Sequence, residues 1–283
     1  MIRIAIQSKG RLHEQTMELL AEADIKLGAV KRTLLIKSRN FPIEVLYLRD
    51  DDIPSSVANG TADIGIVGEN ELAEQQAEVD IAMRLGFSRC RLSLAIPKET
   101  PYDDFHWFEG KTIATSYPEI LKKYLNEQGI KAHIHRIGGS VEISPSIGLA
   151  DAIFDIVSSG STLVSNNLKE VEVVMESEAV LITKRELSDE KRQMLDQLLF
   201  RFEAVRQAED KKYVRMNVPR QQLDAMLRLL PGLKSPTIIP LADEEWCSVH
   251  TVLDDQRLWE IIGKLKELGA QGILVTPIEK MIL

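Results

Sequence analysis

The stretch Ala152–Leu163, AIFDIVSSGSTL, decides the fold, because it joins a strand pattern to a helix start through small polar residues. The apolar run 152–157 predicts a buried strand. Ser158, Ser159 and Gly160 form a loop, and we expect a helix to begin directly after it. A strand that leads through a loop into a helix is the unit from which α/β folds are built.

The loop after this strand carries the donors that an anion needs. Hydroxyl and backbone N–H groups converge there, and Gly160 lets the backbone approach a ligand without a Cβ in the way. The carboxylate of Asp155 would repel a phosphate but suits vicinal hydroxyls, such as those of a ribose. The pattern therefore predicts a sugar-phosphate site, although Ser, Thr and Gly are also common at helix N-caps that bind no ligand.

Strand–helix alternation extends on both sides of this stretch. Upstream, strands are predicted at 2–6, 45–48, 64–67, 92–96, 112–115 and 132–137, with helices between them. Downstream, strands at 171–175 and 179–183 precede a long amphipathic helix that begins at Asp189. Alternation of this kind predicts an α/β fold with mostly parallel sheets.

The segment after the charged residues 207–212 has a different order of elements. It reads strand 213–218, helix 219–230, strand 237–241, strand 247–252, helix 255–268 and strand 273–276. This βαββαβ order is that of a ferredoxin-like unit.

Composition excludes several classes of protein. The chain has 283 residues, of which 44% are hydrophobic and 28% charged, and this balance is typical of globular domains. Its net charge of −8 argues against non-specific nucleic-acid binding, which needs a basic surface. Cys90 and Cys247 are too few for a disulfide framework. With no signal peptide and no membrane-spanning apolar run, we expect a cytoplasmic protein.

Two further polar segments follow predicted strands, where ligands of open α/β sheets bind. Around Gly10, the cations Lys9 and Arg11 suit a diphosphate, or they form a solvated basic turn. Arg49 follows another strand, and the acidic run 50–52 suits hydrated Mg²⁺ or caps the next helix. No nucleophile-elbow or His-Glu-x-x-His motif is present, so hydrolytic chemistry of those kinds lacks support.

A longer pattern runs from Glu142 to the end of the opening stretch. Its defined positions are Glu142, Gly148, Ala150, Ile153, Asp155, Ile156, Ser159, Gly160, Thr162 and Leu163. This pattern resembles the signature of the ATP phosphoribosyltransferase family, which catalyses the first step of histidine biosynthesis. Segments 8–12, 49–54, 65–70, 90–95 and 113–118 are similar to the same family, and 235–238 and 277–281 to its long form.

The resemblance implies a fold and a domain division. The catalytic part would have two α/β lobes like a type II periplasmic-binding protein, with the active site in the cleft. Lobe I would comprise 1–90 with 180–212, and lobe II would comprise 91–179. A ferredoxin-like (ACT- or PII-like) regulatory domain would occupy 213–283 and bind histidine.

The resemblance also implies a reaction and its partners. The phosphoribosyl group of phosphoribosyl diphosphate would move to N1 of the ATP adenine with Mg²⁺ as cofactor, releasing diphosphate. Histidine would inhibit the enzyme, AMP or ADP would be further candidate regulators, and the chain would form dimers and hexamers.

Roles follow by resemblance, position by position. Asp155, Lys9 and Arg49 would be catalytic, with Asp155 on the ribose hydroxyls. The 5-phosphate would lie against Ser158, Ser159, Gly160, Ser161 and Thr162. The diphosphate or triphosphate would face Lys9, Gly10, Arg11 and Arg49. The nucleotide would be lined by Gly68, Glu69, Ser116 and Tyr117, with Tyr117 as a packing surface for adenine. Glu142 would serve magnesium or a hydroxyl. Histidine would contact Asn217, Ser235, Thr237, Val252 and Gly272.

Two other readings deserve comparison. Prephenate dehydratases also pair a binding-protein-like catalytic part with an ACT domain, but their Thr-Arg-Phe motif does not occur in this chain. A cytoplasmic amino-acid-sensing binding protein would not need the phosphate loop. Diphosphate release distinguishes these three functions.

Overall fold

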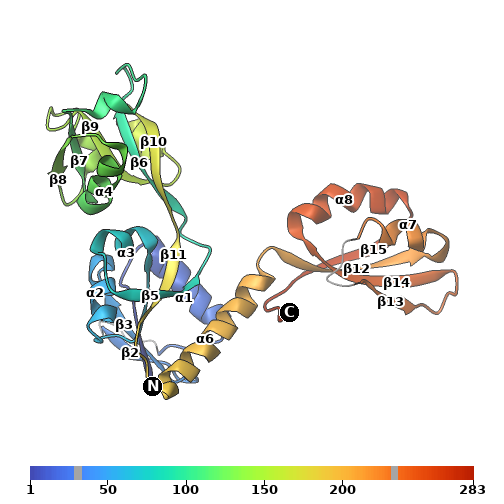
Figure 1. Cartoon of the computed structure of the whole chain (residues 1–283). Coiled ribbons are helices and arrows are strands. Elements are labelled where there is room, and N and C mark those ends of the chain that lie inside the picture. The colour runs from blue at the N-terminus through green and yellow to red at the C-terminus, as the bar shows by residue number, and fades with distance from the viewer. Residues whose placement is uncertain (29–33, 231–234) are drawn as a thin grey trace. The chain divides into compact units, whose positions relative to one another are not determined.

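The computed structural model describes residues 1–28, 34–230 and 235–283. It divides into two compact units, Met1–Gln197 and Leu198–Leu283 (Figure 1). Within the described ranges, no helix is long and apolar enough to cross a membrane.

The first unit holds two sheets, and the first of them has six strands in the order β2-β3-β1-β4-β11-β5. The strands are β1 (Ile2–Gln7), β2 (Leu35–Lys37), β3 (Ile43–Leu48), β4 (Ile64–Gly68), β5 (Val79–Arg84) and β11 (Ala179–Lys184). The helices that follow these strands are α1 (Arg11–Glu22), α2 (Ile53–Ala58) and α3 (Glu69–Gln75). We call this sheet with its helices lobe I.

The second sheet has five strands in the order β10-β6-β9-β7-β8. The strands are β6 (Cys90–Pro97), β7 (Thr112–Thr115), β8 (His133–Arg136), β9 (Ala152–Val157) and β10 (Leu168–Ser177). The helices are α4 (Pro118–Gln128) and α5 (Ser161–Ser165), and we call this sheet with its helices lobe II. The long helix α6 (Asp189–Ala208) follows β11.

Both sheets share one layout. Three parallel strands lie together, β3-β1-β4 in one sheet and β8-β7-β9 in the other. Beside them runs an antiparallel strand that the chain enters from the other lobe, β11 in lobe I and β6 in lobe II. This is the two-lobed binding-protein-like layout that the family resemblance implied. The remaining ladders of both sheets are antiparallel, so the expectation of mostly parallel sheets holds only for these three neighbouring strands in each sheet.

The chain passes between the lobes twice, at residues 85–89 and at Glu178. The two crossings pair with each other through backbone hydrogen bonds, Leu85 N–H to the Ala179 carbonyl at 2.9 Å and Ala179 N–H to the Phe87 carbonyl at 3.0 Å. The crossings therefore form one short antiparallel connection rather than two independent linkers.

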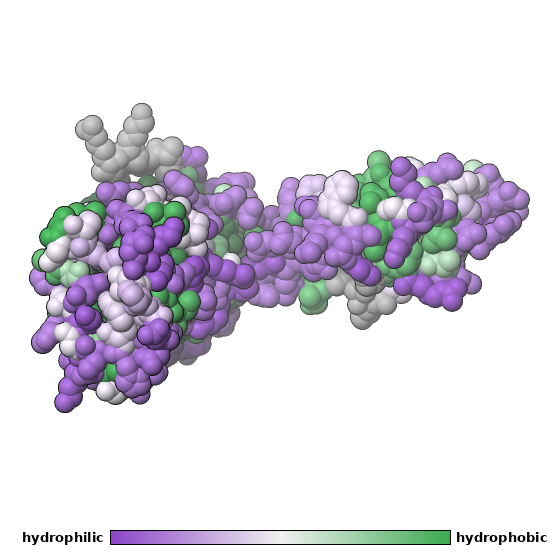
Figure 2. Space-filling view, turned by 90° about the horizontal axis from the view of Figure 1, so that it is seen from above, coloured by the Kyte–Doolittle hydropathy of each residue, from purple (hydrophilic) through white to green (hydrophobic). Residues whose placement is uncertain are grey.

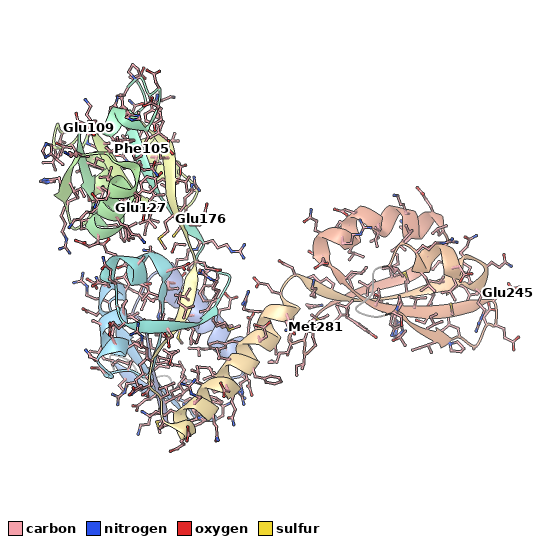
Figure 3. The ribbon with its side chains drawn as sticks, in the orientation of Figure 1. Phe105, Glu109, Glu127, Glu176, Glu245 and Met281 are labelled. Atoms are coloured by element: carbon pink, nitrogen blue, oxygen red, sulfur yellow. The ribbon has the colours of Figure 1, made fainter. Side chains whose placement is uncertain are left out.

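Each lobe buries its own apolar core. In lobe I the strand side chains of Ile4, Ile6 and Ile64 are fully buried. Lobe II packs aromatic side chains, and the ring of Phe105 lies 5.3 Å from that of Phe108 and 5.4 Å from that of Tyr124 (Figure 3). The apolar strands predicted from the sequence thus contribute to two separate cores, one in each lobe.

The second unit has a four-stranded antiparallel sheet in the order β13-β14-β12-β15. Its elements are β12 (Lys211–Pro219), α7 (Leu223–Leu227), β13 (Thr237–Pro240), β14 (Trp246–Asp254), α8 (Asp255–Glu267) and β15 (Gln271–Pro277). Val214, Met216 and Val218 face the buried side chains of α7 and α8. The expected α/β fold with a C-terminal ferredoxin-like domain is confirmed.

One predicted helix is much shorter than expected. The segment 219–230 contains a 3₁₀ turn at Arg220–Gln222 and the five-residue α7 instead of one continuous helix. Met226 and Leu230 are both buried, so a short helix followed by a turn satisfies the apolar spacing that suggested a longer one. The structure also contains β2, α3 and β5, which the sequence pattern did not predict.

One face of the molecule is shown in Figure 2 with its hydropathy. Figure 2 shows hydrophilic side chains over most of the face in view, with apolar patches between them. On the second unit, Ile238, Ile239 and Leu274 are among the exposed large hydrophobic residues.

Candidate active site

The loop after β9 presents its polar side chains at the surface. Ser158 and Ser159 are exposed, and the hydroxyl groups of Ser159 and Ser161 lie 3.0 Å apart. Gly160 has φ of +80°, a left-handed conformation that glycine adopts without strain. The side chain of Thr162 is also exposed, while Leu163 is buried and anchors the following turn. The loop is therefore accessible to a ligand, and the buried Leu163 side chain anchors it to the lobe II core.

Asp155 lies in β9, just before this loop, and is half-buried. The pKa of its carboxyl is raised to about 6, mainly by burial and also by the negative charge of Glu142. The N–H of Ile156, which donates to the carboxylate at 2.8 Å, acts in the opposite direction. Glu142 belongs to a 3₁₀ turn, Val141–Ile143. The structure thus brings the two acidic residues of the sequence pattern within electrostatic reach of each other.

The cationic segments of lobe I share one edge of its sheet. Lys9, Gly10 and Arg11 follow β1, and Arg49 follows β3. These strands are parallel neighbours with Gln7 opposite Leu48, so the two segments meet at the carboxyl end of the sheet. Arg49 is exposed and pairs with Asp51 at 3.2 Å. Three cations and one glycine therefore gather where open α/β sheets bind ligands.

The residues expected to line the nucleotide already have contacts within their own lobes. Both carboxylate oxygens of Glu69 accept hydrogen bonds from Arg84 at 2.5 Å. A Cβ on Gly68 would clash with the side-chain oxygen of the buried Asn70, so a larger residue there would displace the Asn70 side chain. On lobe II, the Ser116 hydroxyl donates to the carbonyl of Ile137 at 2.9 Å.

Tyr117 joins the two lobes. Its ring is 8% exposed and belongs to the lobe II core. Its hydroxyl donates to a Glu71 carboxylate oxygen at 3.0 Å and accepts from the Asn70 amide at 3.3 Å, and both of these residues lie in α3. Burial raises the pKa of Tyr117 well above its ordinary value, and the charge of Glu71 adds to this. The buried ring offers little free surface for stacking with adenine.

In the second unit, three of the expected histidine contacts share one face of the sheet. The register places Thr237 opposite His250 and His250 opposite Arg215, two residues before Asn217. By the same alternation Val252 faces this side, away from the buried face of α7 and α8. A Cβ on Gly272 would lie 3.7 Å from the Asn217 amide nitrogen, so these two positions are adjacent. Ser235 is exposed and precedes β13.

Comparison with known proteins decides the family. The family model described as ATP phosphoribosyltransferase matches residues 49–204, and the model of the HisG C-terminal domain matches residues 208–280. The ATP phosphoribosyltransferase of Bacteroides thetaiotaomicron is 66% identical over 283 residues, covering 100% of both chains. The chain belongs to the ATP phosphoribosyltransferase family.

Other relatives agree with this assignment. The ATP phosphoribosyltransferase of Cytophaga hutchinsonii is 54% identical over 281 residues, covering 99% of this chain and 98% of that one. A solved chain of the ATP phosphoribosyl transferase (HisG:HisZ) complex from Thermotoga maritima has 28% identity and a TM-score of 0.63. It covers 71% of this chain and 96% of its own length. The sequence pattern around Glu142 had identified the same enzyme family.

Several residues of this ATP phosphoribosyltransferase have contacts that the sequence did not predict. Asn70 and Ser177 are both buried and exchange hydrogen bonds, with the Ser177 hydroxyl 2.8 Å from the Asn70 side-chain oxygen. Glu74 in α3 accepts from the backbone N–H groups of Glu119 and Ile120 at the start of α4. Asn70 lies in a family-like segment, but nothing in the sequence marks its partner Ser177, which is distant along the chain.

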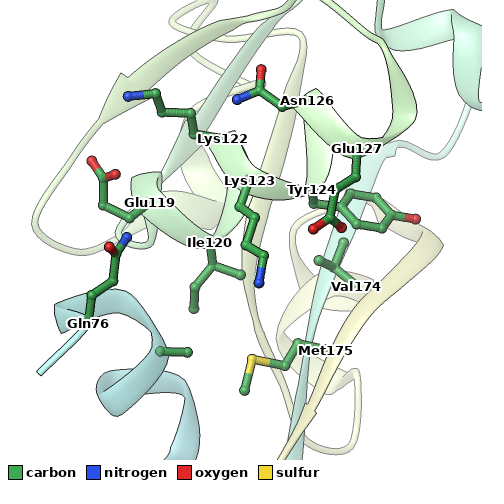
Figure 4. Close-up of a pocket in the computed structure, with 11 residues that line it drawn as sticks. Gln76, Glu119, Ile120, Lys122, Lys123, Tyr124, Asn126, Glu127, Val174 and Met175 are labelled. Carbon is green, nitrogen blue, oxygen red and sulfur yellow. The ribbon is translucent and has the colours of Figure 1, made fainter. Parts of the chain in front are cut away.

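A cavity of about 810 Å³ lies along α3, α4 and β10. Figure 4 shows Lys123 of α4 extending toward Met175 of β10. None of the site residues expected from the sequence lines this cavity, so its size alone does not mark the active site. Across the described residues, no group of three or more His, Cys, Asp or Glu side chains is arranged to hold a metal ion.

Proposed function

We propose that the carboxyl edges of the two lobe sheets together form the phosphoribosyl-transfer site. The observation that carries this proposal is the position of Asp155, a half-buried carboxylate directly before an exposed loop rich in hydroxyl groups. Asp155 would accept hydrogen bonds from the ribose hydroxyls. The residues that would hold the 5-phosphate are Ser158, Ser159, Gly160, Ser161 and Thr162.

The cations of lobe I would bind the charged groups of the two substrates. Lys9, Arg11 and Arg49 lie together at the edge of the lobe I sheet, with Gly10 between the first two. Diphosphate gains charge as the bond to ribose C1 breaks, so fixed cations stabilise the transition state more than the ground state. Lys9 and Arg49 would contribute most directly.

The reaction asks little of a protein nucleophile. The adenine N1 attacks ribose C1 as diphosphate leaves, and the sugar passes through an oxocarbenium-like state. Because both reacting atoms belong to the substrates, holding them in line is the main contribution of the protein. Gly68, Glu69, Ser116 and Tyr117 would define the nucleotide side of the site, with Tyr117 acting through its hydroxyl and its link to α3.

The residues near Asp155 fit a divalent cation bound with the substrate. Glu142 and Asp155 repel each other enough to affect the pKa of Asp155, and a cation between substrate and protein would relieve this repulsion. Mg²⁺ usually takes one or two carboxylates together with substrate phosphates. When bound, Mg²⁺ would neutralise charge on the departing diphosphate, and Glu142 is the protein carboxylate we assign to it.

We also propose the domain roles. Lobe I would comprise 1–90 with 180–212, lobe II 91–179, and the regulatory domain 213–283. The regulatory domain would bind histidine, a feedback inhibitor, at Asn217, Ser235, Thr237, Val252 and Gly272. AMP or ADP would compete as nucleotides that resemble the substrate, and the active assembly would be a homo-oligomer. Two free cysteines agree with a cytoplasmic location.

The test is a spectrophotometric assay of phosphoribosyl-ATP formation with ATP, phosphoribosyl diphosphate, Mg²⁺ and a pyrophosphatase. Asp155→Ala should lower kcat/KM for phosphoribosyl diphosphate by about tenfold to 150-fold, because a charged hydrogen-bond partner is worth about 1.5–3 kcal/mol. Asp103→Ala removes an exposed carboxylate of lobe II and is the matched control. An unchanged rate in Asp155→Ala would remove Asp155 from the site.

A further inference from the structure

A partly buried chain of polar side chains leads to the loop that follows β9. The Ser93 hydroxyl in β6 donates to Glu170 Oε1 at 2.6 Å, and Ser93 itself is 1% exposed. Glu170 in β10 also accepts from Arg91 Nε and Nη2, each at 2.6 Å. The third contact of the guanidinium runs from Arg91 Nη1 to the backbone carbonyl of Ser158 at 3.2 Å. The chain thus connects the sheet interior to the first residue of the loop.

The geometry of this contact matters because of the peptide that follows. In a trans peptide, the carbonyl of one residue and the N–H of the next point in opposite directions. Fixing the Ser158 carbonyl against Arg91 therefore also fixes the direction of the Ser159 N–H, away from Arg91. That N–H belongs to the loop we assign to the 5-phosphate.

Arg91 and Glu170 form an ion pair with each other. Their two-point contact has the fork geometry in which arginine holds a carboxylate most rigidly. Hydrogen bonding from Arg91 lowers the pKa of Glu170, with the Ser93 hydroxyl adding to the effect, so the carboxylate stays ionised at neutral pH. Arg91 is thus suited to hold the loop and not to serve as a direct phosphate ligand.

Side-chain packing leaves space on this side of the loop. A cavity of about 340 Å³ is lined by residues that include Arg91, Lys98, Ser159, Gly160 and Glu170. The hydrogen bond from Arg91 therefore provides a restraint that close packing does not supply.

We propose that Arg91, held by Glu170 and Ser93, is a positioning residue that orients the phosphate-binding loop. The inference rests on the proposed function of that loop. It predicts that the pair acts on the binding of phosphoribosyl diphosphate and leaves the binding of ATP nearly unchanged.

The experiment compares Arg91→Lys and Glu170→Gln with the wild-type chain. Arg91→Lys keeps the positive charge but loses the fork, and we expect KM for phosphoribosyl diphosphate to rise about tenfold. Glu170→Gln should raise the same KM several-fold. Because the two residues act through one contact, the KM of the double variant should rise by less than the product of the two single increases. KM for ATP and the melting temperature should change little in each variant.

The control is Lys98→Met, which removes an exposed cation from the same cavity. A raised KM for phosphoribosyl diphosphate in Lys98→Met, with a normal KM in Arg91→Lys, would mean that general positive charge matters and not the contact with Ser158, and would overturn the inference. So would parallel changes in both KM values and in the melting temperature, which indicate a purely structural role. If Asp155→Ala has a lowered kcat/KM for phosphoribosyl diphosphate while the Arg91 and Glu170 variants match the wild type, only this inference is wrong. If Asp155→Ala also matches the wild type, the proposed function of the loop is wrong as well.

Discussion

At the scale of single residues, Asp155 shows how burial prepares a carboxyl group for a ligand. The side chain is half-buried in the sheet, and this desolvation raises its pKa to about 6. Close to neutral pH the group is largely ionised but poorly hydrated. A ligand hydroxyl that donates to it replaces hydration that the fold has already removed, so the hydrogen bond gains strength.

The same burial predicts how Asp155 affects stability. Its folded pKa is above its unfolded value of 3.8, so the stabilisation from the neutral form is complete below about pH 4 and is lost as the pH rises through about 6. Asp155→Asn has no carboxyl group to ionise, so it does not lose this stability as the pH rises. Relative to the wild type, the variant should gain up to about 3 kcal/mol in free energy of unfolding between pH 4 and pH 7.

Urea denaturation at both pH values measures this difference, with Asp103→Asn as the exposed control. If the free energies of unfolding of Asp155→Asn and the wild type differ by the same amount at pH 4 and pH 7, the assigned burial effect is wrong.

At the scale of elements, helix α3 connects the lobes. Glu74 accepts hydrogen bonds from the N–H groups of Glu119 and Ile120 at 3.1 Å, at the start of α4. These N–H groups have no partner inside their own helix, and a carboxylate there also interacts favourably with the helix dipole. A helix of one lobe thus receives its N-terminal cap from the other lobe.

Glu74→Ala should therefore lower the free energy of unfolding by about 1 kcal/mol, the usual value of an N-terminal cap. Hydrogen exchange at the start of α4 should become faster, because the cap and the contact between lobes are lost together. Gln75→Ala changes an exposed neighbour on the same helix and serves as the control. Unchanged exchange at residues 119–120 would show that the contact does not hold the lobes in solution.

At the scale of the whole molecule, the chain combines a catalytic unit with a ferredoxin-like unit that has its own core. Regulation by a ligand of the second unit requires a coupling free energy between the two sites. Such couplings are typically about 1–3 kcal/mol, which corresponds to roughly 5–150-fold changes in affinity.

We expect saturating histidine to inhibit phosphoribosyl-ATP formation by a factor in that range and to shift the protein toward a larger oligomer. Initial rates and sedimentation velocity, each with and without histidine, measure the two effects. Glutamine at the same concentration is the control ligand. Full activity at saturating histidine would refute the regulatory role of the second unit.

Local sequence determined a large part of this protein. An apolar run predicts the strand 152–157, and small hydroxyl residues with a glycine predict the loop after it. Asp155 lies in the same strand, so all of these signals fall within a few residues of one another. The order of elements in the second unit follows from the same local signals, because each helix or strand there has its own apolar period. The family pattern around Glu142 is also local and contiguous.

Only the tertiary structure decided which distant residues meet. The contact of Arg91 with Ser158 and that of Glu74 with the start of α4 join residues far apart in the chain, and no local pattern encodes such pairs. The family resemblance implies a packing surface for adenine at Tyr117, and only the fold shows that its side chain belongs to the core of lobe II. The apolar residues of segment 219–230 have helical spacing, but the fold buries them with a 3₁₀ turn and a short helix. Propensity and periodicity act over a few residues, whereas burial and pairing depend on the whole fold.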